Sequence, residues 1–409
     1  MTDQAALDRL SEVCADVLKR CVGAGASQAE VAASIDLGLD VGVRMGEVET
    51  ITRNRDRGVS VSVYFGHRKG SAHTADLDRR SIEQTVEHAC AIARYTEEDP
   101  CNGLADPALL AHEFPDLDVW HPWDITADEA VALALEIESA GRDHDARISN
   151  SDGASVQVGA TLIANANSLG FSGTERSTRH SLSCALIAGS ESGMQRDYWY
   201  DTVRSAVDFM PAAALGRRAA QRTLARLGAR TLSTRQCPVL FVPEVARGLL
   251  SHLVSAVSGG ALYRRASFLL DHLDKKIFPD FIQIDEHPRQ LRGLASSNFD
   301  GEGVATRDSA LIRDGVLTRY VLGSYSARKL GMTTTGNAGG VHNLIVEPGS
   351  DDFTALLRRM HKGLVVTELM GQGVSLITGD YSRGAAGFWV ENGEIAYPVE
   401  EVTIASNLR

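Results

Sequence analysis

The chain has 409 residues, of which 44% are hydrophobic and 23% charged, and its formal net charge is -12 with a pI near 5.5. This length and apolar content predict an ordinary globular protein with two or three well-buried domains. The acidic balance disfavours a general nucleic-acid binder and a protein held on an anionic membrane, because both need a basic surface.

The six cysteines are scattered and form no CxxC pair, so we expect reduced thiols in a cytoplasmic protein. The N-terminal stretch MTDQAALDRLSEVCADVLKR has an acid at its third residue and no long apolar run. It therefore predicts neither a signal peptide nor a transmembrane helix. Its apolar residues recur at helical spacing from Leu7 to Leu18, which predicts an opening amphipathic helix that ends at GAGAS.

A β region should follow this helix. Apolar and polar residues alternate with period two over 30–54 and 57–77, which predicts three antiparallel strands with a turn at 66–70. Helical spacing returns over 81–96 and 126–145, and Thr126 with Glu129 predicts a capping box on the second helix. The Pro- and Asp-rich stretch 99–124 between them predicts a loop or a covering segment. From Ile148 the pattern predicts an antiparallel meander.

The segment from Pro211 to Arg235 predicts one helix with a basic stripe. Four arginines are spaced four apart, and this spacing drifts only about 40° per step. The stripe is formed by Arg218, Arg222, Arg226 and Arg230. A solvated helix face and a docking surface for an acidic partner or polyanion both remain open.

A domain boundary is expected at 226–236, where CPVLFVPE begins a new apolar strand followed by the helix ARGLLSHLVSAVSG. The fold class is therefore α+β, with an N-terminal domain (1–226) of antiparallel strands and flanking helices and a β-rich C-terminal domain (232–409) with a few helices. Asp314-Gly315 and Asn392-Gly393 predict two-residue hairpin turns, and FTALLRRMHKGLVV predicts a short helix between them.

A metal site is the first chemistry to test. A zinc peptidase helix carries two histidines one turn apart with a glutamate between them. The helix that follows CPVLFVPE carries His252 alone, His342 and His361 are each isolated in sequence, and no cysteine follows Cys237. We therefore expect this chain to bind no metal and to hold no catalytic residue of that kind.

Two glycine-rich stretches could approach a ligand closely. TTTGNAGGVHN, from Thr333 to Asn343, matches no phosphate-binding motif, so a loop beside a bound strand or partner is favoured over a nucleotide cradle. TGDYSRGAAGFW places three polar residues on a predicted bend, but Ser382 lies in no nucleophile-elbow pattern.

Long blocks of the chain resemble the PmbA/TldE branch of the TldD/PmbA peptidase family. The likeness extends from RMGEVETITRNRDRGVSVSVYFGHRKGSAHTADL and DPCNGLAD to SSNFDGEGVATRDSALIRDGVLTRYVLGSYSARKLGMTTTGNAGGVHNLIVEPG and LITGDYSRGAAGFWVENGEIAYPVEEVTIASNL. It implies a cytoplasmic heterodimeric metallopeptidase that cleaves small or unfolded peptides, including peptide-antibiotic precursors and antitoxins. The second domain would then be equivalent to the family's catalytic domain.

In the TldD-type subunit of this family, an HExxxH helix and a later cysteine bind zinc. The matching segment here is VSAVSG, 254–259, so the resemblance places zinc in a TldD-type partner and no cofactor in this chain. This chain would complete and shield the partner's active-site chamber. Homodimer and heterodimer both stay open, the homodimer for the chain when it is alone. The candidate residues for lining substrate or partner are Gly336, Asn337, Gly339, Gly340, His342, Asp380, Tyr381, Ser382 and Arg383.

Two alternatives stay open. The chain could be a non-enzymatic regulatory homodimer that binds a target such as DNA gyrase, with the arginine stripe as its support. It could also be a peptidase with a site that the sequence does not reveal. Membrane binding is not expected, and nucleic-acid binding is disfavoured by the charge.

Overall fold

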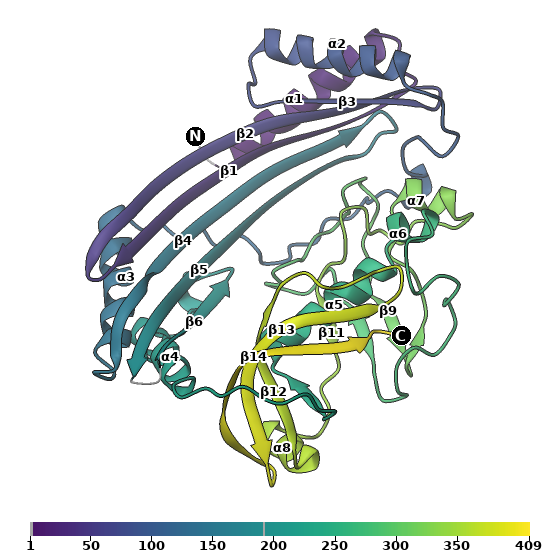
Figure 1. Cartoon of the computed structure of the whole chain (residues 1–409). Helices are drawn as coiled ribbons and strands as arrows, with labels where there is room; N and C mark the ends of the chain where they lie inside the picture. The colour runs from purple at the N-terminus through teal and green to yellow at the C-terminus, as the bar shows by residue number, and fades with distance from the viewer. Residues whose placement is uncertain (1–2, 191–192) are drawn as a thin grey trace.

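A long, curved antiparallel sheet dominates the N-terminal half of the computed structural model, which describes residues 3–190 and 193–409 (Figure 1). The strand order in this sheet is β3-β2-β1-β4-β5-β6, and every neighbouring pair is antiparallel. The strands are β1 (Gln28–Arg44), β2 (Glu47–Phe65), β3 (Arg68–Thr74), β4 (Ile148–Asn167), β5 (Ser172–Ser190) and β6 (Gly193–Val203). We call it the long sheet.

Four helices cover the two ends of one face of the long sheet. Helices α1 (Asp3–Gly23) and α2 (Arg79–Tyr95) pack at one end, and α3 (Ala127–Arg142) and α4 (Ala212–Ala225) pack at the other. Alternate residues of β1 supply both cores, since Val31 and Ala33 lie under the first pair and Leu39 and Val41 under the second. Period-two burial along a single long strand therefore builds two separate hydrophobic clusters.

Most local predictions for this half are confirmed. The opening helix, the three strands β1 to β3 and the meander β4 to β6 are present, and Thr126 and Glu129 form the predicted capping box. The predicted turn at 66–70 is too long, because β3 already begins at Arg68. The tight turn between β1 and β2 at Met45 and Gly46, where both residues have positive φ, was not predicted.

The predicted helix from Pro211 to Arg235 is wrong at its C-terminal end. Helix α4 ends at Ala225, with Arg226 as its C-cap, and Gly228 follows with φ of 74°. The predicted arginine stripe is divided. Arg222 and Arg226 form ion pairs within the chain, whereas Arg218 and Arg230 are exposed. The guanidinium of Arg218 lies 3.7 Å from the ring centroid of Trp199.

The C-terminal part contains two smaller sheets. One has the strand order β10-β9-β8-β11 and the other β14-β13-β12-β7. Their strands are β7 (Val239–Phe241), β8 (Ile284–Glu286), β9 (Ser309–Arg313), β10 (Val316–Leu317), β11 (Leu344–Val346), β12 (Gly363–Met370), β13 (Asp380–Glu391) and β14 (Glu394–Asn407). The helices are α5 (Pro243–Ala256), α6 (Gly259–Tyr263), α7 (Ser324–Lys329) and α8 (Phe353–Met360).

Both predicted hairpin turns are confirmed. Asp314 and Gly315 have φ of 50° and 75° between β9 and β10, and Asn392 and Gly393 have φ of 54° and 79° between β13 and β14. Positive φ at both central residues is the geometry that favours Asp-Gly and Asn-Gly. The predicted α+β fold class is correct for both halves.

The stretch 99–124 is a covering segment that connects the two halves. It is mostly irregular, with one short helix η1 (Pro107–Leu109), and it lies against the C-terminal part. The Arg328 guanidinium donates to the carbonyls of Cys101, Gly103 and Leu104, and the Tyr325 hydroxyl donates to Asp99 at 2.8 Å. A second short helix, η2 (Ala206–Asp208), joins β6 to α4.

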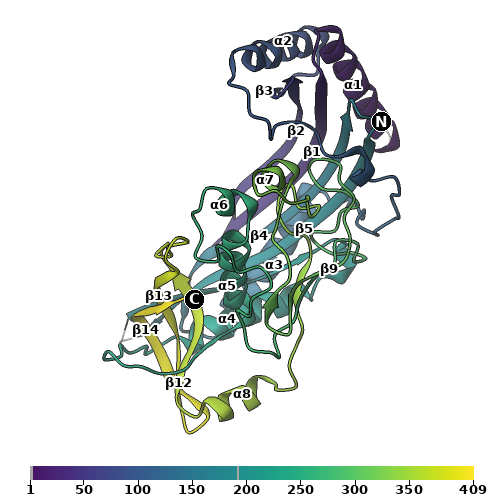
Figure 2. The same cartoon turned by 90° about the vertical axis from the view of Figure 1, so that its right-hand side faces the viewer.

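Figure 2, in which the C-terminal part faces the viewer, shows the long strands passing behind α5, α6 and α7. The C-terminal part thus occupies the face of the long sheet that helices α1 to α4 leave free. Among the described residues, no helix combines the length and the apolar character needed to cross a bilayer.

Candidate functional site

The glycine-rich stretch from Thr333 to Asn343, here called the glycine loop, is held by a buried polar network. Its first part is fixed to Leu322: the Thr335 N–H and the Thr334 hydroxyl both donate to the Leu322 carbonyl, at 3.1 and 2.9 Å. The Thr335 hydroxyl accepts the Leu322 N–H in return at 2.9 Å. The start of the loop is therefore rigid.

Glu286, the last residue of β8, is the centre of the network and is only 2% exposed. Its carboxylate accepts hydrogen bonds from the Asn337 amide at 2.9 Å and from the His342 main-chain N–H at 2.7 Å. The His342 imidazole Nδ1 lies 2.9 Å away, and Arg319 forms an ion pair with the second carboxylate oxygen. One carboxylate thus orients both ends of the glycine-rich turn.

The protonation of Glu286 follows from these contacts. Burial acts to raise its pKa, but the hydrogen bonds from His342 and the charge of Arg319 more than offset burial and hold the pKa below its usual value. Burial lowers the pKa of Arg319, while Glu286 acts in the opposite direction. The pair is ionised at neutral pH, and the Nδ1 of His342 carries a proton that it donates to the carboxylate.

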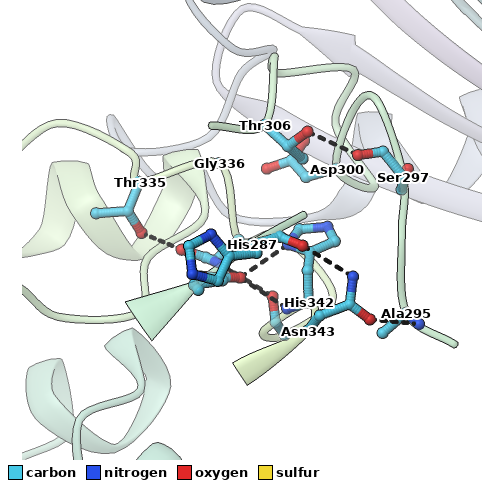
Figure 3. A network of polar contacts seen from close by, with 12 residues as sticks. His287, Ala295, Ser297, Asp300, Thr306, Thr335, Gly336, His342 and Asn343 are labelled. Atoms are coloured by element: carbon cyan, nitrogen blue, oxygen red, sulfur yellow. Dashed lines mark hydrogen bonds and ion pairs between the residues drawn. The ribbon is translucent and has the colours of Figure 1, made fainter. Parts of the chain in front are cut away.

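A second buried carboxylate, Asp300, holds the tip of the glycine loop. It accepts the N–H of Ala338 at 2.9 Å on one oxygen and the N–H groups of Glu302 and Val304 on the other. Burial raises the pKa of Asp300 to about 6, although these hydrogen bonds oppose the shift. Figure 3 shows Asp300 beside the Ser297–Thr306 hydrogen bond, with His342 and Asn343 below it.

The network reaches the long sheet through β5. Glu175 on that strand accepts hydrogen bonds from the Ser297 hydroxyl at 2.7 Å and the Asn298 N–H at 2.9 Å. Burial raises the pKa of Glu175, and the nearby His342 and Arg204 offset part of this effect. Polar groups of both halves of the chain therefore share one interior network.

The outer side of the glycine loop lines a pocket of about 360 Å³ against the long sheet. Strand residues form the floor, including Glu30 and Lys69, whose charged groups are 3.4 Å apart. The roof is glycine-rich: Gly301, Glu302, Gly303, Ala338 and Gly339. We call this cavity the sheet pocket.

Two roof glycines are required for different reasons. Gly303 has φ of 80°, and an added Cβ would lie 2.7 Å from the Phe171 ring, so no larger residue fits. Gly339 has φ of 109° with no atom within 4 Å of an added Cβ, so only its backbone conformation demands glycine. The roof thus presents bare main chain to the pocket.

The structure separates the predicted lining residues. Gly339 lines the sheet pocket, whereas Asn337 is buried in the network and His342 is held against Glu286. Gly336 packs near Ala305, and the Gly340 carbonyl accepts a hydrogen bond from the Asn337 amide at 3.1 Å. His342 has no neighbouring metal-ligand residue in the sequence, but in the fold it belongs to the network around Glu286.

The second predicted group does not form a bend. Asp380 to Arg383 begin strand β13, where alternate residues point to opposite sides. Tyr381 is 3% exposed, while Asp380 and Ser382 are exposed on the other side. Asp380 binds the Thr378 hydroxyl at 2.6 Å and the Asn407 amide at 3.0 Å. This group lies outside the sheet pocket.

The residues near His252 do not fit a zinc ion. His252 lies on α5 with its ring centroid 6.1 Å from that of Tyr381, in an edge-to-face arrangement. From Ala246 to Gly260 the chain carries one histidine, no cysteine and no carboxylate. Within residues 3–190 and 193–409, no three His, Cys, Asp or Glu side chains are grouped as metal ligands would be.

Sequence reasoning missed the acidic centres of the network. Glu286 and Asp300 precede the first residue of the glycine loop, Thr333, by 47 and 33 residues, and neither belongs to a recognisable motif. The signal that could have found Glu286 is its position in the short alternating run FIQIDEH, where a carboxylate follows apolar residues on the inward side.

Family models match most of the chain. The models described as PmbA/TldA metallopeptidase domain 1, central domain and C-terminal domain match residues 29–93, 120–227 and 234–409. The Metalloprotease PmbA of Escherichia coli O157:H7 is 51% identical over 381 residues, which cover 93% of this chain and 85% of that relative.

Solved structures give the same picture. A putative modulator of DNA gyrase from Bacteroides thetaiotaomicron superposes with a TM-score of 0.92 at 28% identity, covering 97% of this chain and 90% of that one. TldE from Thermococcus kodakarensis gives a TM-score of 0.85 at 20% identity, covering 97% and 91%, and this second likeness shows the fold alone.

Proposed function

Because this chain belongs to the PmbA/TldE branch of the PmbA/TldD metallopeptidase family, we propose that it is the non-metal-binding subunit of a heterodimeric peptidase. A TldD-type partner would carry the zinc, and the complex would cleave small or unfolded peptides such as peptide-antibiotic precursors and antitoxins. The composition of α5 supports a zinc site in the partner and none in this chain, because His252 is the one side chain after Glu244 in this helix that could bind a metal.

The sheet pocket is the observation that carries the proposal for this chain. It combines strand residues with a roof that includes the exposed Gly301 and Gly339, and the main chain of such exposed glycines can be approached closely by an extended peptide. The network around Glu286 keeps the roof rigid. The pocket would form one wall of the chamber in which the partner's metal acts.

Coexpression with a TldD-type chain from the same genome tests the assembly. We expect one heterodimer by light scattering, and about one zinc ion per heterodimer, with zinc lost when the partner's histidines are replaced. Two separate species in solution would sink the proposal. So would a zinc ion retained by this chain purified alone.

The role of the roof can be tested in the same complex. Gly339→Ala forces a side chain into a backbone conformation with φ of 109°, so it should distort the pocket and slow hydrolysis of an unstructured peptide several-fold. Gly331→Ala is the matched control, since Gly331 has φ of 66° and an equally open surrounding outside the pocket. Equal activity of both variants would remove the pocket from the proposal.

The alternative of a gyrase-binding homodimer finds no support in the arginine stripe. Arg222 and Arg226 pair with Asp197 and Glu368, and Arg218 lies on the Trp199 ring. Arg222 and Arg226 therefore hold α4 to β6 and to β12. With two of the four arginines paired inside the chain, we do not propose this role.

A further inference from the structure

A second polar cavity, of about 380 Å³, lies where β6 of the long sheet meets α5, β12 and β13 of the C-terminal part. We call it the aromatic pocket, because Tyr198, Trp199 and Tyr200 form one of its walls. The opposite wall includes Arg247 and Ser251 of α5 and Arg383 of β13. It shares no lining residue with the sheet pocket.

Part of the charge in this pocket is already balanced. Asp197 accepts Arg222 at 3.3 Å and lies 3.8 Å from Arg226, which also pairs with Glu368 at 2.5 Å. Two arginines and two carboxylates therefore neutralise one another at the edge of the cavity. These four side chains therefore contribute no net charge to the binding of a ligand.

The remaining charge is positive. Arg247 and Arg383 line the pocket, and neither forms an ion pair with any described residue, while Glu244 is the one remaining carboxylate in the lining. Two cations against one anion leave one net positive charge facing the cavity. Arg247 is exposed, whereas Arg383 is partly buried. A partly buried guanidinium without a counter-ion is costly, so Arg383 is the stronger reason to expect an anionic partner.

The surroundings of Arg383 strengthen this point. Its Nε is buried and has no hydrogen-bond partner among the described residues, and the same holds for the Tyr381 hydroxyl and His252 Nε2. Burial lowers the pKa of His252, and Arg383 lowers it further, so the imidazole is neutral. Burial also raises the pKa of Tyr381. Three neighbouring side chains thus leave polar atoms unsatisfied, and none supplies a negative charge.

The aromatic wall adds an apolar surface. The rings of Tyr198 and Tyr200 are stacked with centroids 6.2 Å apart and an interplanar angle of 24°, and Arg247 lies 5.8 Å from the Tyr200 ring. Arg218 covers one face of Trp199. A ligand here would meet both guanidinium groups and tyrosine rings in one cavity.

We propose that the aromatic pocket binds a carboxylate that is attached to an apolar or aromatic group. Arg247 and Arg383 receive the carboxylate, because guanidinium groups match carboxylate oxygens in charge and planar geometry. Tyr198 and Tyr200 pack against the apolar group. A free peptide C-terminus and an acidic side chain both present this chemistry. The site does not depend on the proposed peptidase role, because every residue belongs to this chain.

The test is calorimetric titration of the purified full-length chain. The probes are Ala-Ala-Phe as the free acid, the same peptide as its C-terminal amide, Ala-Glu-Phe amide and inorganic phosphate. We expect the free acid to bind about tenfold or more tightly than Ala-Ala-Phe amide. Binding of Ala-Glu-Phe amide at the strength of the acid would assign the site to carboxylates in general, and its failure would assign it to the peptide C-terminus.

Variants locate the binding. Arg247→Gln and Arg383→Gln should each weaken the acid about tenfold or more, and Glu244→Gln should strengthen it. Arg235→Gln is the matched control, since Arg235 packs on the Trp389 ring away from the pocket. If Arg383→Gln fails to fold in a circular dichroism melt, Arg383→Lys and Arg247→Gln decide the question.

Three results would overturn the assignment. The first is equal binding of acid and amide, and the second is the absence of binding at millimolar peptide by the folded protein. The third is unchanged binding in both arginine variants. Binding of phosphate without binding of either carboxylate would replace the carboxylate site with a phosphate site.

Discussion

Glu286 accepts hydrogen bonds from two nitrogens of His342, the main-chain N–H at 2.7 Å and the imidazole Nδ1 at 2.9 Å. The same carboxylate oxygen also accepts the Asn337 amide at 2.9 Å. These contacts join β8 to the glycine loop just before β11, which pairs with β8. A single buried side chain therefore closes the loop and sets the register of the strand that follows it.

Glu286→Ala should destabilise the protein strongly. The substitution leaves Arg319 buried without its partner, and such a loss costs about 3–5 kcal/mol. Chemical denaturation of wild type and variant, fitted with a two-state model, measures this change in the free energy of unfolding. Asp308→Ala is the control, because Asp308 is exposed and its ion pair is with His287, whose side chain is itself 39% exposed, and it should change stability by about 0.5 kcal/mol or less. A Glu286→Ala effect no larger than the control would contradict the central role of this carboxylate.

Asp300 predicts an unusual pH dependence. Its pKa is about 6 in the folded chain and 3.8 in the reference state, so folding favours the protonated form. The stabilisation is complete below pH 3.8 and is lost as pH rises through 6. In Asp300→Asn this loss disappears, although the amide NH2 group cannot accept the Ala338 N–H as the carboxylate oxygen does, so the variant is less stable overall.

The measurement is the free energy of unfolding of both proteins between pH 4 and 7. The wild type should lose stability relative to Asp300→Asn across this interval. Glu286 acts in the opposite sense, because its lowered pKa gives stability that is lost only as pH falls below its ordinary range. Parallel pH profiles for the two proteins would show that Asp300 does not titrate in this window.

Arg226 connects the two halves of the chain. Its guanidinium pairs with Glu368 on β12 at 2.5 Å and lies 3.8 Å from the buried Asp197 on β6. Arg226→Ala should cost about 1–3 kcal/mol, since both carboxylates lose a partner. Arg217→Ala on the exposed side of α4 should be nearly neutral. Thermal melts of the two variants distinguish the cases, and equal melting temperatures would exclude the contact as a stabilising one.

Two buried tyrosines allow the contribution of a tyrosine hydroxyl to the free energy of unfolding to be compared with and without a hydrogen bond. The Tyr381 hydroxyl has no hydrogen-bond partner among the described residues, whereas the Tyr64 hydroxyl donates to Glu30 at 3.1 Å. Tyr381→Phe should leave stability unchanged or raise it slightly, and Tyr64→Phe should cost about 1 kcal/mol. If Tyr381→Phe is the more damaging of the two, a water or another group satisfies that hydroxyl.

Local patterns predicted the regular elements well, because their signals lie within a few residues. The Thr126–Glu129 capping box and the Asp314-Gly315 turn each depend on residues at most three positions apart, and both are present. The end of α4 was missed, since residues after Ala225 keep helical periodicity while Arg226 is drawn to Asp197 and Glu368. Gly228, whose φ is 74°, and the ion pairs of Arg226 both accompany the end of this helix.

The site was only partly predictable for the same reason. Glycines at 336–340 indicated a close approach of main chain, and Gly339 does line a cavity. The residues that hold the loop come from distant segments, such as Glu286 and Asp300, and no local spacing joins them. The bend predicted at Asp380 to Arg383 is wrong, because Gly384 continues strand β13 and pairs with Thr403 of β14.

The covering segment has a consequence for synthesis of the protein on the ribosome. Asp99 binds Lys329 across 230 positions of sequence, and Arg328 binds three carbonyls of the same stretch. The long sheet can form as soon as β6 has been made, but residues 99–124 must wait until α7 has emerged. During that interval the segment and the free face of the sheet remain uncovered, so a nascent chain stalled before Lys329 would be the species that needs a chaperone.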